Sequence, residues 1–419
     1  MDKRTFLRNA GLAGFGAMLS FDSLAQMIKS VSAVSSTELA SDEEFWATIR
    51  EGYRLKPDYI NLENGYYCFL PEQVLEKFID HVREVNFQGS YYMRTAKDKN
   101  KKAMAAKLAE AAACSPDELI ITRNTTESLD MIIGGLDWKP GDEAVMAEQD
   151  YGAMLNMFRQ VSKRYGVVNK MVSVPNHPES DEEIVDLYAS ALTDKTRLLM
   201  VCHMINITGH ILPVRKICDM AHAKGVEVMV DGAHAFGHFT FSIPDLHCDY
   251  YGSSLHKWLS APLGSGLLYV KKNKIANVWP LIASGNKEPD DISRLNHTGT
   301  HPDHTDLTIE DALDFQNIIG AERKEARLRY IQNYWTSKVR DLPHVILNTP
   351  ADPARSCAIA NVGIRGMEPS ELADTLFSKH KIYTVPINVA GVHGCRITPN
   401  VYTTTGELDV LVDALTQLQ

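Results

Sequence analysis

Short apolar runs alternate with amphipathic stretches between residues 118 and 270, and this alternation restricts the possible folds strongly. The amphipathic stretches, at 127–134, 153–165, 182–191 and 214–224, have apolar residues at helical spacing. Buried strands that alternate with helices predict an α/β fold with a mostly parallel sheet covered by helices on both faces. The apolar runs are 118–122, 143–147, 170–174, 196–202, 226–230, 250–253 and 266–270.

A Pro/Gly/Asp-rich segment at 284–306 interrupts this pattern. Helical spacing at 309–339 follows it, and then a smaller β/α pattern at 356–418. We therefore expect three parts after the N-terminus. They are a segment at 26–65 that packs with the small domain, a large domain at 66–290, and a small C-terminal α/β domain at 291–419.

The first 25 residues have the layout of an export signal. A basic start, Lys3-Arg4-Thr5-Phe6-Leu7-Arg8, precedes a Gly/Ala-rich apolar run and the small residues of Ser23-Leu24-Ala25. The apolar run is too short to span a bilayer as a helix. The start resembles a twin-arginine signal with Lys in place of the first Arg. We expect residues 1–25 to direct export to the periplasm, with no membrane attachment after their removal; a cytoplasmic protein with an N-terminal arm is the alternative.

Composition restricts the partners. Forty-three Lys and Arg against fifty-three Asp and Glu give a formal net charge of −10, which argues against a nucleic-acid binder. The seven cysteines include no C-x-x-C pair, so neither a disulfide framework nor a zinc site is expected. The loop residues His297, His301, Asp303, His304 and Asp306 have metal-binding side chains, but we interpret this segment as a polar boundary loop and predict no metal.

Polar side chains gather where the predicted strands end, and ligands of such sheets bind beyond the carboxyl ends of the strands. Asp231 follows the run 226–230, Lys257 follows the run 250–253, and Thr125-Thr126 open a helix after the run 118–122. Pyridoxal phosphate needs these groups: a lysine for its aldehyde, a carboxylate for its pyridine nitrogen, and a helix N-terminus with hydroxyls for its phosphate. Each residue alone could be an ordinary helix cap or loop residue. Together, in this order, they predict a pyridoxal-phosphate site.

The chain here resembles a known family, the class V aminotransferases. These are pyridoxal-phosphate enzymes of fold type I that include cysteine desulfurases and isopenicillin N epimerase-like proteins. The resemblance covers residues 58–416 and implies a mostly parallel seven-stranded sheet flanked by helices, with a smaller C-terminal α/β domain. The motifs that carry it are Thr122-Arg123-Asn124-Thr125-Thr126-Glu127, Gln149-Asp150-Tyr151, His203 with Asn206 and Gly209, Asp231-Gly232-Ala233-His234, Ser254-Leu255-His256-Lys257, Gly299-Thr300 and Cys395-Arg396-Ile397-Thr398-Pro399.

The resemblance implies a role for each matching residue. Lys257 would form the Schiff base with the cofactor and move the α-proton of the substrate. Thr300 would reach the phosphate of a neighbouring subunit, which implies a homodimer with active sites at the subunit interface. Asp231 would pair with the pyridine nitrogen, Ala233 and Tyr151 would lie on the two ring faces, and Asn206 and His234 would lie near the ring hydroxyl. The phosphate would be bound by Thr125, Thr126, Ser254 and His256. Arg396 would bind the substrate carboxylate, and Asn64 and Gly65 would line the substrate side of the site.

Three functions remain open from the sequence. The first is transamination or α-carbon epimerisation of an α-amino acid or an amino-acid-bearing small molecule. The second is β-elimination or C–S lysis. Persulfide chemistry of the desulfurase type is disfavoured, because 392–396 leaves no loop for a nucleophilic cysteine and Cys395 is expected to be a buried structural residue. The third is a non-catalytic ligand-binding protein of the same α/β class.

Overall fold

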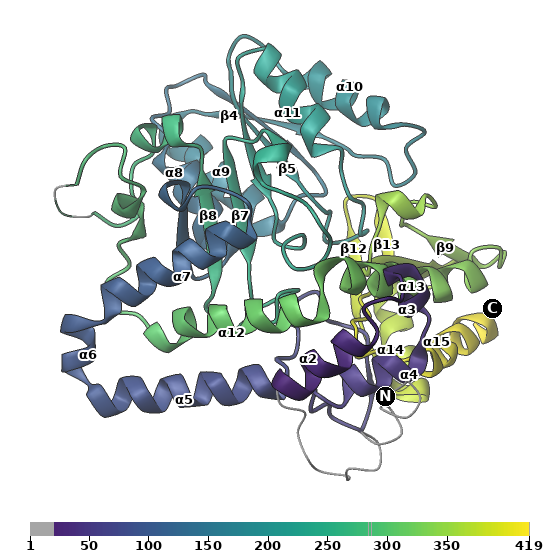
Figure 1. Ribbon diagram of the computed structural model, residues 1–419. Coiled ribbons are helices and arrows are strands. Elements are labelled where there is room, and N and C mark those ends of the chain that lie inside the picture. The colour runs from purple at the N-terminus through teal and green to yellow at the C-terminus, as the bar shows by residue number, and fades with distance from the viewer. Residues whose placement is uncertain (1–20, 284, 286, 419) are drawn as a thin grey trace.

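A seven-stranded sheet forms the centre of the protein in the computed structural model, which describes residues 21–283, 285 and 287–418 (Figure 1). Its order is β2-β8-β7-β6-β5-β3-β4. β8 is antiparallel to both of its neighbours, and the other neighbouring pairs are parallel. The predicted mostly parallel seven-stranded sheet is therefore confirmed. The strands are β2 (Leu119–Thr122), β3 (Glu143–Ala147), β4 (Val168–Val172), β5 (Thr196–Cys202), β6 (Glu227–Asp231), β7 (Tyr250–Ser254) and β8 (Gly266–Val270).

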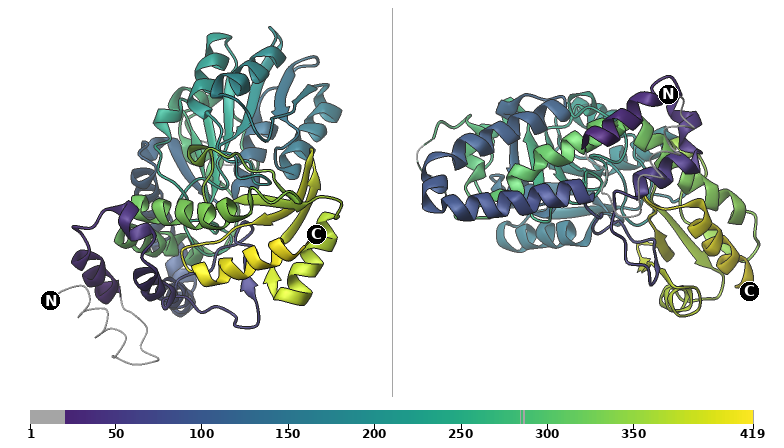
Figure 2. Two further views of the ribbon diagram at one scale, coloured as in Figure 1. Left: turned by 90° about the vertical axis from the view of Figure 1, so that its right-hand side faces the viewer. Right: turned by 60° about the horizontal axis from the view of Figure 1, so that its bottom comes forward.

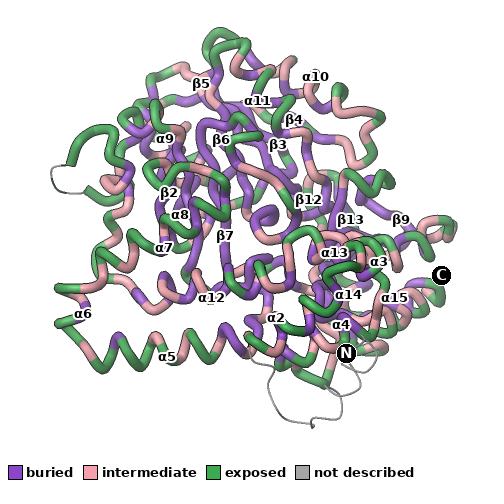
Figure 3. The backbone as a smooth tube through the Cα atoms, viewed as in Figure 1, coloured by how far each residue is buried: buried purple, intermediate pink, exposed green. Residues whose placement is uncertain are grey.

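Successive residues of these strands face opposite sides of the sheet, and both sides are covered by helices. In β3, Ala144 and Met146 join the core beneath α8 (Thr125–Gly135) and α9 (Gly152–Tyr165), whereas Val145 and Ala147 join the core beneath α10 (Asp181–Ala191) and α11 (Val214–Ala223). Figure 3 shows the sheet as a buried layer between more exposed helices. Burial on both faces explains why the sequence shows continuous apolar runs instead of alternating ones.

Two local expectations were wrong. The edge strand β4 begins at Val168 and not at residue 170, because its pairing with β3 fixes the register from Glu143↔Val168 onward. The helical pattern at 309–339 is divided between α12 (Asp303–Ile319) and α13 (Ala321–Val339). Gly320 separates them with φ +90°, a backbone conformation that L-residues with a side chain rarely adopt.

The C-terminal part contains an antiparallel sheet of order β12-β13-β10-β9. α14 (Pro369–His380) packs on this sheet and also contacts α15 (Thr405–Gln417). The strands are β9 (Val345–Leu347), β10 (Ala360–Ile364), β12 (Val385–Val389) and β13 (Val392–Ile397). A smaller C-terminal α/β unit was expected, and the structure contains one.

The N-terminal segment lies against the C-terminal part (Figure 2). β1 (Ile60–Asn61) pairs in parallel with β11 (Ile382–Tyr383), and α3 (Ser36–Ala40) packs on α13. α4 (Glu43–Arg50) lies between α3 and β1 in the chain. α5 (Glu72–Gln88), α6 (Ser90–Thr95) and α7 (Lys97–Ala111) follow, and α12 packs along α5 and α7. The exact domain boundaries stay a prediction.

The predicted signal lies mostly outside the described residues, which begin at Phe21. Residues 21–25 belong to α2 (Phe21–Ser30), whose Leu24 and Met27 are buried and which packs on α12. Within the described part of the chain, no helix is long and apolar enough to cross a membrane. Processing after Ala25 and export stay predictions.

Candidate active site

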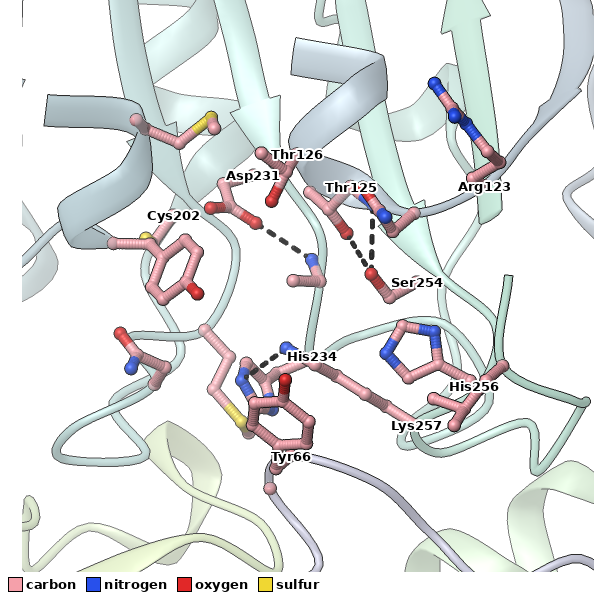
Figure 4. Close-up of a pocket in the computed structure, with 18 of the residues that line it drawn as sticks. Tyr66, Arg123, Thr125, Thr126, Cys202, Asp231, His234, Ser254, His256 and Lys257 are labelled. Carbon is pink, nitrogen blue, oxygen red and sulfur yellow. Dashed lines mark hydrogen bonds between the residues drawn. The ribbon is translucent and has the colours of Figure 1, made fainter. Parts of the chain in front are cut away.

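A cavity of about 310 Å³ lies at the carboxyl ends of β2, β5, β6 and β7 (Figure 4). Strand ends and the first turn of α8 supply most of its walls, as expected for an open α/β sheet. The predicted residues that the fold brings together there are Gly65, Thr125, Thr126, Tyr151, Asn206, Asp231, Ala233, His234, Ser254, His256, Lys257 and Arg396.

Asp231 ends β6 and is buried, with one carboxylate oxygen accepting a hydrogen bond of 3.0 Å from the Ala233 N–H. Burial raises the pKa of this carboxyl, while the Ala233 hydrogen bond and the nearby charge of Lys257 oppose that rise. Burial lowers the pKa of the Lys257 amine to about 8, and the Asp231 carboxylate opposes that change. The two groups together provide a reactive lysine and a buried carboxylate in one cavity.

His234 contacts the lysine, with 3.0 Å between its Nε2 and Lys257 Nζ. The indole Nε1–H of Trp258 donates to His234 Nδ1 at 3.3 Å. An indole nitrogen is only a donor, so Nδ1 is the acceptor and the ring proton of neutral His234 is on Nε2. Burial, followed by the charges of Lys257 and Arg396, holds the pKa of His234 well below its ordinary value. When Lys257 is neutral, the Nε2–H of neutral His234 therefore donates to the lone pair of Nζ.

The first turn of α8 faces the other end of the cavity. The Thr125 hydroxyl lies 2.7 Å from the Ser254 hydroxyl, and the Thr125 N–H donates to that same oxygen at 2.9 Å. Asn124 caps the helix by accepting from the Glu127 N–H. His256 Nδ1 is buried without a hydrogen-bond partner among the described residues. Backbone donors at a helix N-terminus, hydroxyls and this orphaned nitrogen fit an anion such as a phosphate.

Arg396 projects from β13 into the cavity and meets a carboxylate that the sequence interpretation missed. Its Nη2 lies 2.6 Å from Glu63 Oε1, its Nε lies 3.3 Å from Glu63 Oε2, and its Nη1 donates to the Asn206 carbonyl at 3.3 Å. Both side chains of the ion pair are more than nine-tenths buried. The position of Glu63, next to the predicted Asn64-Gly65, was the available signal.

Two predicted residues do not line the cavity in this chain. Asn64 is fully buried, and its side chain donates to the Thr398 carbonyl and accepts from the Tyr402 hydroxyl. Its direct contact with substrate stays a prediction. Thr300 is exposed, in a segment that does not reach this cavity, so its assignment to a neighbouring subunit also stays a prediction.

Several lining residues were not assigned roles from the sequence. Arg123 and Asn124 belong to the motif that opens α8 but were given no role of their own, and the others are mostly apolar residues or neighbours of motif residues. The lining residues without an assigned role are Tyr66, Arg123, Asn124, Met154, Cys202, Met204, Leu263 and Gly264.

The polar segment that contains His301, Asp303 and Asp306 forms a separate, mostly buried cluster. Possible ligand atoms of His301, Asp303 and Asp306 lie within 4.8 Å of one another. Lys101 Nζ lies 3.3 Å from His301 Nε2 and 3.7 Å from Asp306 Oδ2, so an ammonium already supplies positive charge there. Burial raises the pKa of Asp306 to about 7.

Cys395 is fully buried on β13, and its thiol donates to the Pro369 carbonyl. Burial raises the pKa of this thiol to about 12. A buried thiol with a raised pKa is a poor nucleophile. This placement agrees with the structural role expected for Cys395.

The donor set fits pyridoxal phosphate. The cavity offers a lysine amine, a buried carboxylate opposite it, an anion-binding helix N-terminus and the orphaned His256 nitrogen. Tyr151 (side chain half exposed) and Ala233 also line the cavity, where a planar ring could contact them.

The chain is similar to known proteins along most of its length. It is 26% identical over 390 residues to isopenicillin N epimerase of Streptomyces clavuligerus, covering 89% of this chain and 98% of that protein. It is 24% identical to cysteine desulfurase of Haloferax volcanii, covering 85% and 88%. Among solved structures it resembles a C-DES mutant with glycine covalently linked to the PLP cofactor, with a TM-score of 0.78, 20% identity and coverage of 87% and 97%.

The similarity to this solved structure extends over most of both chains, so the chain has the fold of a pyridoxal-phosphate enzyme of fold type I, as expected from the sequence. The family model described as aminotransferase class-V matches residues 69–400, which include all the strands of the central sheet and Arg396. The protein therefore belongs to the class V aminotransferase family.

Proposed function

We propose that this protein is a pyridoxal-phosphate-dependent enzyme that acts on an α-amino acid or an amino-acid-bearing small molecule, by transamination or α-carbon epimerisation. The observation that carries the proposal is Lys257, a partly buried amine with a pKa of about 8 that shares its cavity with Asp231, His234 and the N-terminus of α8. Membership of the class V aminotransferase family and similarity to isopenicillin N epimerase support it.

Each group has a distinct task. The first turn of α8, with Ser254 and His256, would bind the phosphate, and Asp231 would pair with the protonated pyridine nitrogen. Bound pyridoxal phosphate supplies a ring that stabilises negative charge at the substrate α-carbon. Lys257 would hold the cofactor through its aldehyde, and its Nζ, when neutral, would accept the α-proton of the substrate. Arg396 would orient the substrate in the cavity.

The test compares the wild type with the Lys257→Ala variant by absorbance spectroscopy and by activity assay. The purified wild type is expected to have a yellow chromophore that borohydride reduces, and the variant is expected to lose both this chromophore and turnover. A panel of L-amino acids, scored for α-keto products and for loss of chirality, separates transamination from epimerisation. Normal turnover by Lys257→Ala, or a wild type without the chromophore, would contradict the proposal and favour a non-catalytic ligand-binding protein.

The second candidate is β-elimination or C–S lysis, which the similarity to cysteine desulfurases favours. It begins at the same α-carbon and differs in the group that leaves from the β-carbon. A keto acid formed while the cofactor keeps its original spectrum would identify the lyase. The burial of Cys395 argues against the desulfurase form of this chemistry.

We also propose that the enzyme is a homodimer and that residues 1–25 direct it to the periplasm. Exposed large apolar side chains at the end of α5, in α6 and after β8 support the dimer, because contact with a second subunit would remove them from water. They are Phe87, Tyr91, Trp279, Leu281 and Ile282. The basic and apolar N-terminus supports export.

A further inference from the structure

The ion pair between Glu63 and Arg396 affects which substrate groups can bind in the cavity. Glu63 covers the edge of the guanidinium formed by Nε and Nη2, at 3.3 and 2.6 Å. Its Oε1 also accepts a hydrogen bond of 2.9 Å from the Tyr66 N–H. Arg396 therefore enters the cavity as half of a neutral pair, not as a free cation.

The backbone does not need this ion pair to hold Glu63 in place. Glu63 forms a parallel bridge with Thr398, the Thr398 N–H donates to the Leu62 carbonyl, and the Leu62 N–H donates to the Tyr383 carbonyl. The Asn64 N–H donates to the Thr398 hydroxyl at 2.6 Å. Because these bonds already fix the segment, the charge of Glu63 is available for a different role.

Gly65 places the pair at the cavity wall. A Cβ on this glycine would lie 2.7 Å from Arg396 Cζ and 2.8 Å from its Nη2, so only glycine lets the guanidinium lie flat against the backbone here. Arg396 and Gly65 both line the cavity that contains Lys257. The edge of the guanidinium left for a substrate at Lys257 is the one formed by Nη1 and Nη2, where Nη1 also donates to the Asn206 carbonyl at 3.3 Å and the Glu63 carboxylate lies beside Nη2.

A substrate carboxylate at this position has to share Arg396 with Glu63 or displace it. Like charges within a few ångströms in a buried site repel each other, whereas a neutral amide or ester oxygen meets no such repulsion. The attraction of the cavity for a substrate carboxylate is reduced accordingly, and its tolerance of a neutral polar group in that place is increased.

We propose that Glu63 is a specificity-determining residue: by neutralising Arg396 it lets the enzyme accept amines that have a neutral polar group, such as a carboxamide, where an α-amino acid has its carboxylate. This inference rests on the proposed pyridoxal-phosphate function. Glu63 differs from the groups that perform the chemistry, because it acts through Arg396 and not on the reacting atoms.

The test compares L-alanine with L-alaninamide, which differ in that one group. Each is titrated into the holoenzyme, and the change in cofactor absorbance yields an apparent dissociation constant. Glu63→Gln keeps the shape of the side chain and removes its charge. We expect the preference for L-alanine over L-alaninamide to rise about tenfold in this variant, as expected for removal of one buried competing charge.

Two further variants isolate the cause. Glu63→Asp keeps a negative charge near Arg396 and is expected to stay closer to the wild-type preference than Glu63→Gln. Glu371→Gln makes the same change of net charge at an exposed residue of α14 and is expected to leave the preference unchanged.

An equal weakening of both ligands in Glu63→Gln would show a merely structural role and would overturn the inference. The inference would also be overturned if Glu63→Gln had the same preference between the two ligands as the wild type, or if neither the wild type nor Glu63→Gln responded to L-alanine. These outcomes are distinct from failure of the proposed function, in which the wild type itself has no chromophore that depends on Lys257.

Discussion

At the scale of single residues, the site depends on how three buried groups distribute charge. Burial lowers the pKa of Lys257 to about 8, whereas the charge of Asp231 acts in the opposite direction. Trp258 fixes the His234 proton on the nitrogen that faces the lysine. A lysine must be neutral to react with an aldehyde, so this environment makes Lys257 reactive near neutral pH.

The pH dependence of cofactor uptake tests this balance. The neutral fraction of Lys257 increases as pH rises through its pKa, so uptake of pyridoxal phosphate by the cofactor-free enzyme is expected to accelerate with a midpoint at about pH 8 and to level off above it. Asp231→Asn removes a charge that raises this pKa, so the midpoint is expected to move to lower pH. Stopped-flow absorbance measures both profiles. A midpoint that stays in place or moves upward in Asp231→Asn would refute the electrostatic account.

At the scale of elements, the connection between α12 and α13 decides how the central and C-terminal parts are joined. α12 packs along α5 and α7, and α13 packs on α3 and α15. One continuous helix would follow a single axis and could not make both sets of contacts. Gly320, at φ +90° and ψ 125°, allows the chain to change direction, and its N–H still caps α12 by donating to the Gln316 carbonyl at 2.9 Å.

Gly320→Ala is expected to destabilise the protein by about 2 kcal/mol, because alanine is strained in this backbone conformation. Its Cβ would also lie 3.3 Å from Arg323 Nη1. The free energy of unfolding from urea titration measures the effect. Gly406→Ala in α15 is the matched control: no positive φ occurs there and the nearest atom to the new Cβ is 3.9 Å away, so its stability should equal or exceed that of the wild type. Equal stability of the Gly320→Ala variant and the wild type would contradict the expected strain.

At the scale of the whole molecule, the question is whether one chain contains a complete site. The cavity holds the predicted lysine, carboxylate and phosphate donors, but Thr300 lies exposed elsewhere. Phe87 is 86% exposed and Trp279 is 67% exposed. Such exposure is unusual for large apolar side chains, and a second copy of the chain that covers them would explain it. The proposed dimer would complete both the surface and the site.

Hybrid dimers test this arrangement. Thr300→Asp is expected to lose activity because its carboxylate repels the cofactor phosphate, and Lys257→Ala is expected to be inactive for its own reason. If Thr300 acts on the neighbouring subunit, a co-expressed hybrid of the two variants contains one intact site, so activity is expected to recover. Purification with two different affinity tags isolates the hybrid for assay. A hybrid that stays inactive, or a monomer with full activity, would contradict a shared site.

Much of the fold and the cofactor site could be predicted because their signals are local. Burial of strands on both sides leaves uninterrupted apolar runs, and the carboxyl ends of parallel strands meet at one edge, so Asp231, Lys257 and Thr125 could be placed together without coordinates. These are the features that the amino-acid sequence determined by itself.

Only the tertiary structure decided the contacts between distant segments. Glu63 and Arg396 are 333 positions apart and meet because β1 pairs with β11 and Glu63 bridges Thr398. The direction of β8, the turn at Gly320 and the hydrogen bond from Trp258 to His234 likewise depend on packing. No local periodicity encodes such contacts, because their energy comes from groups that approach each other only after the chain has folded.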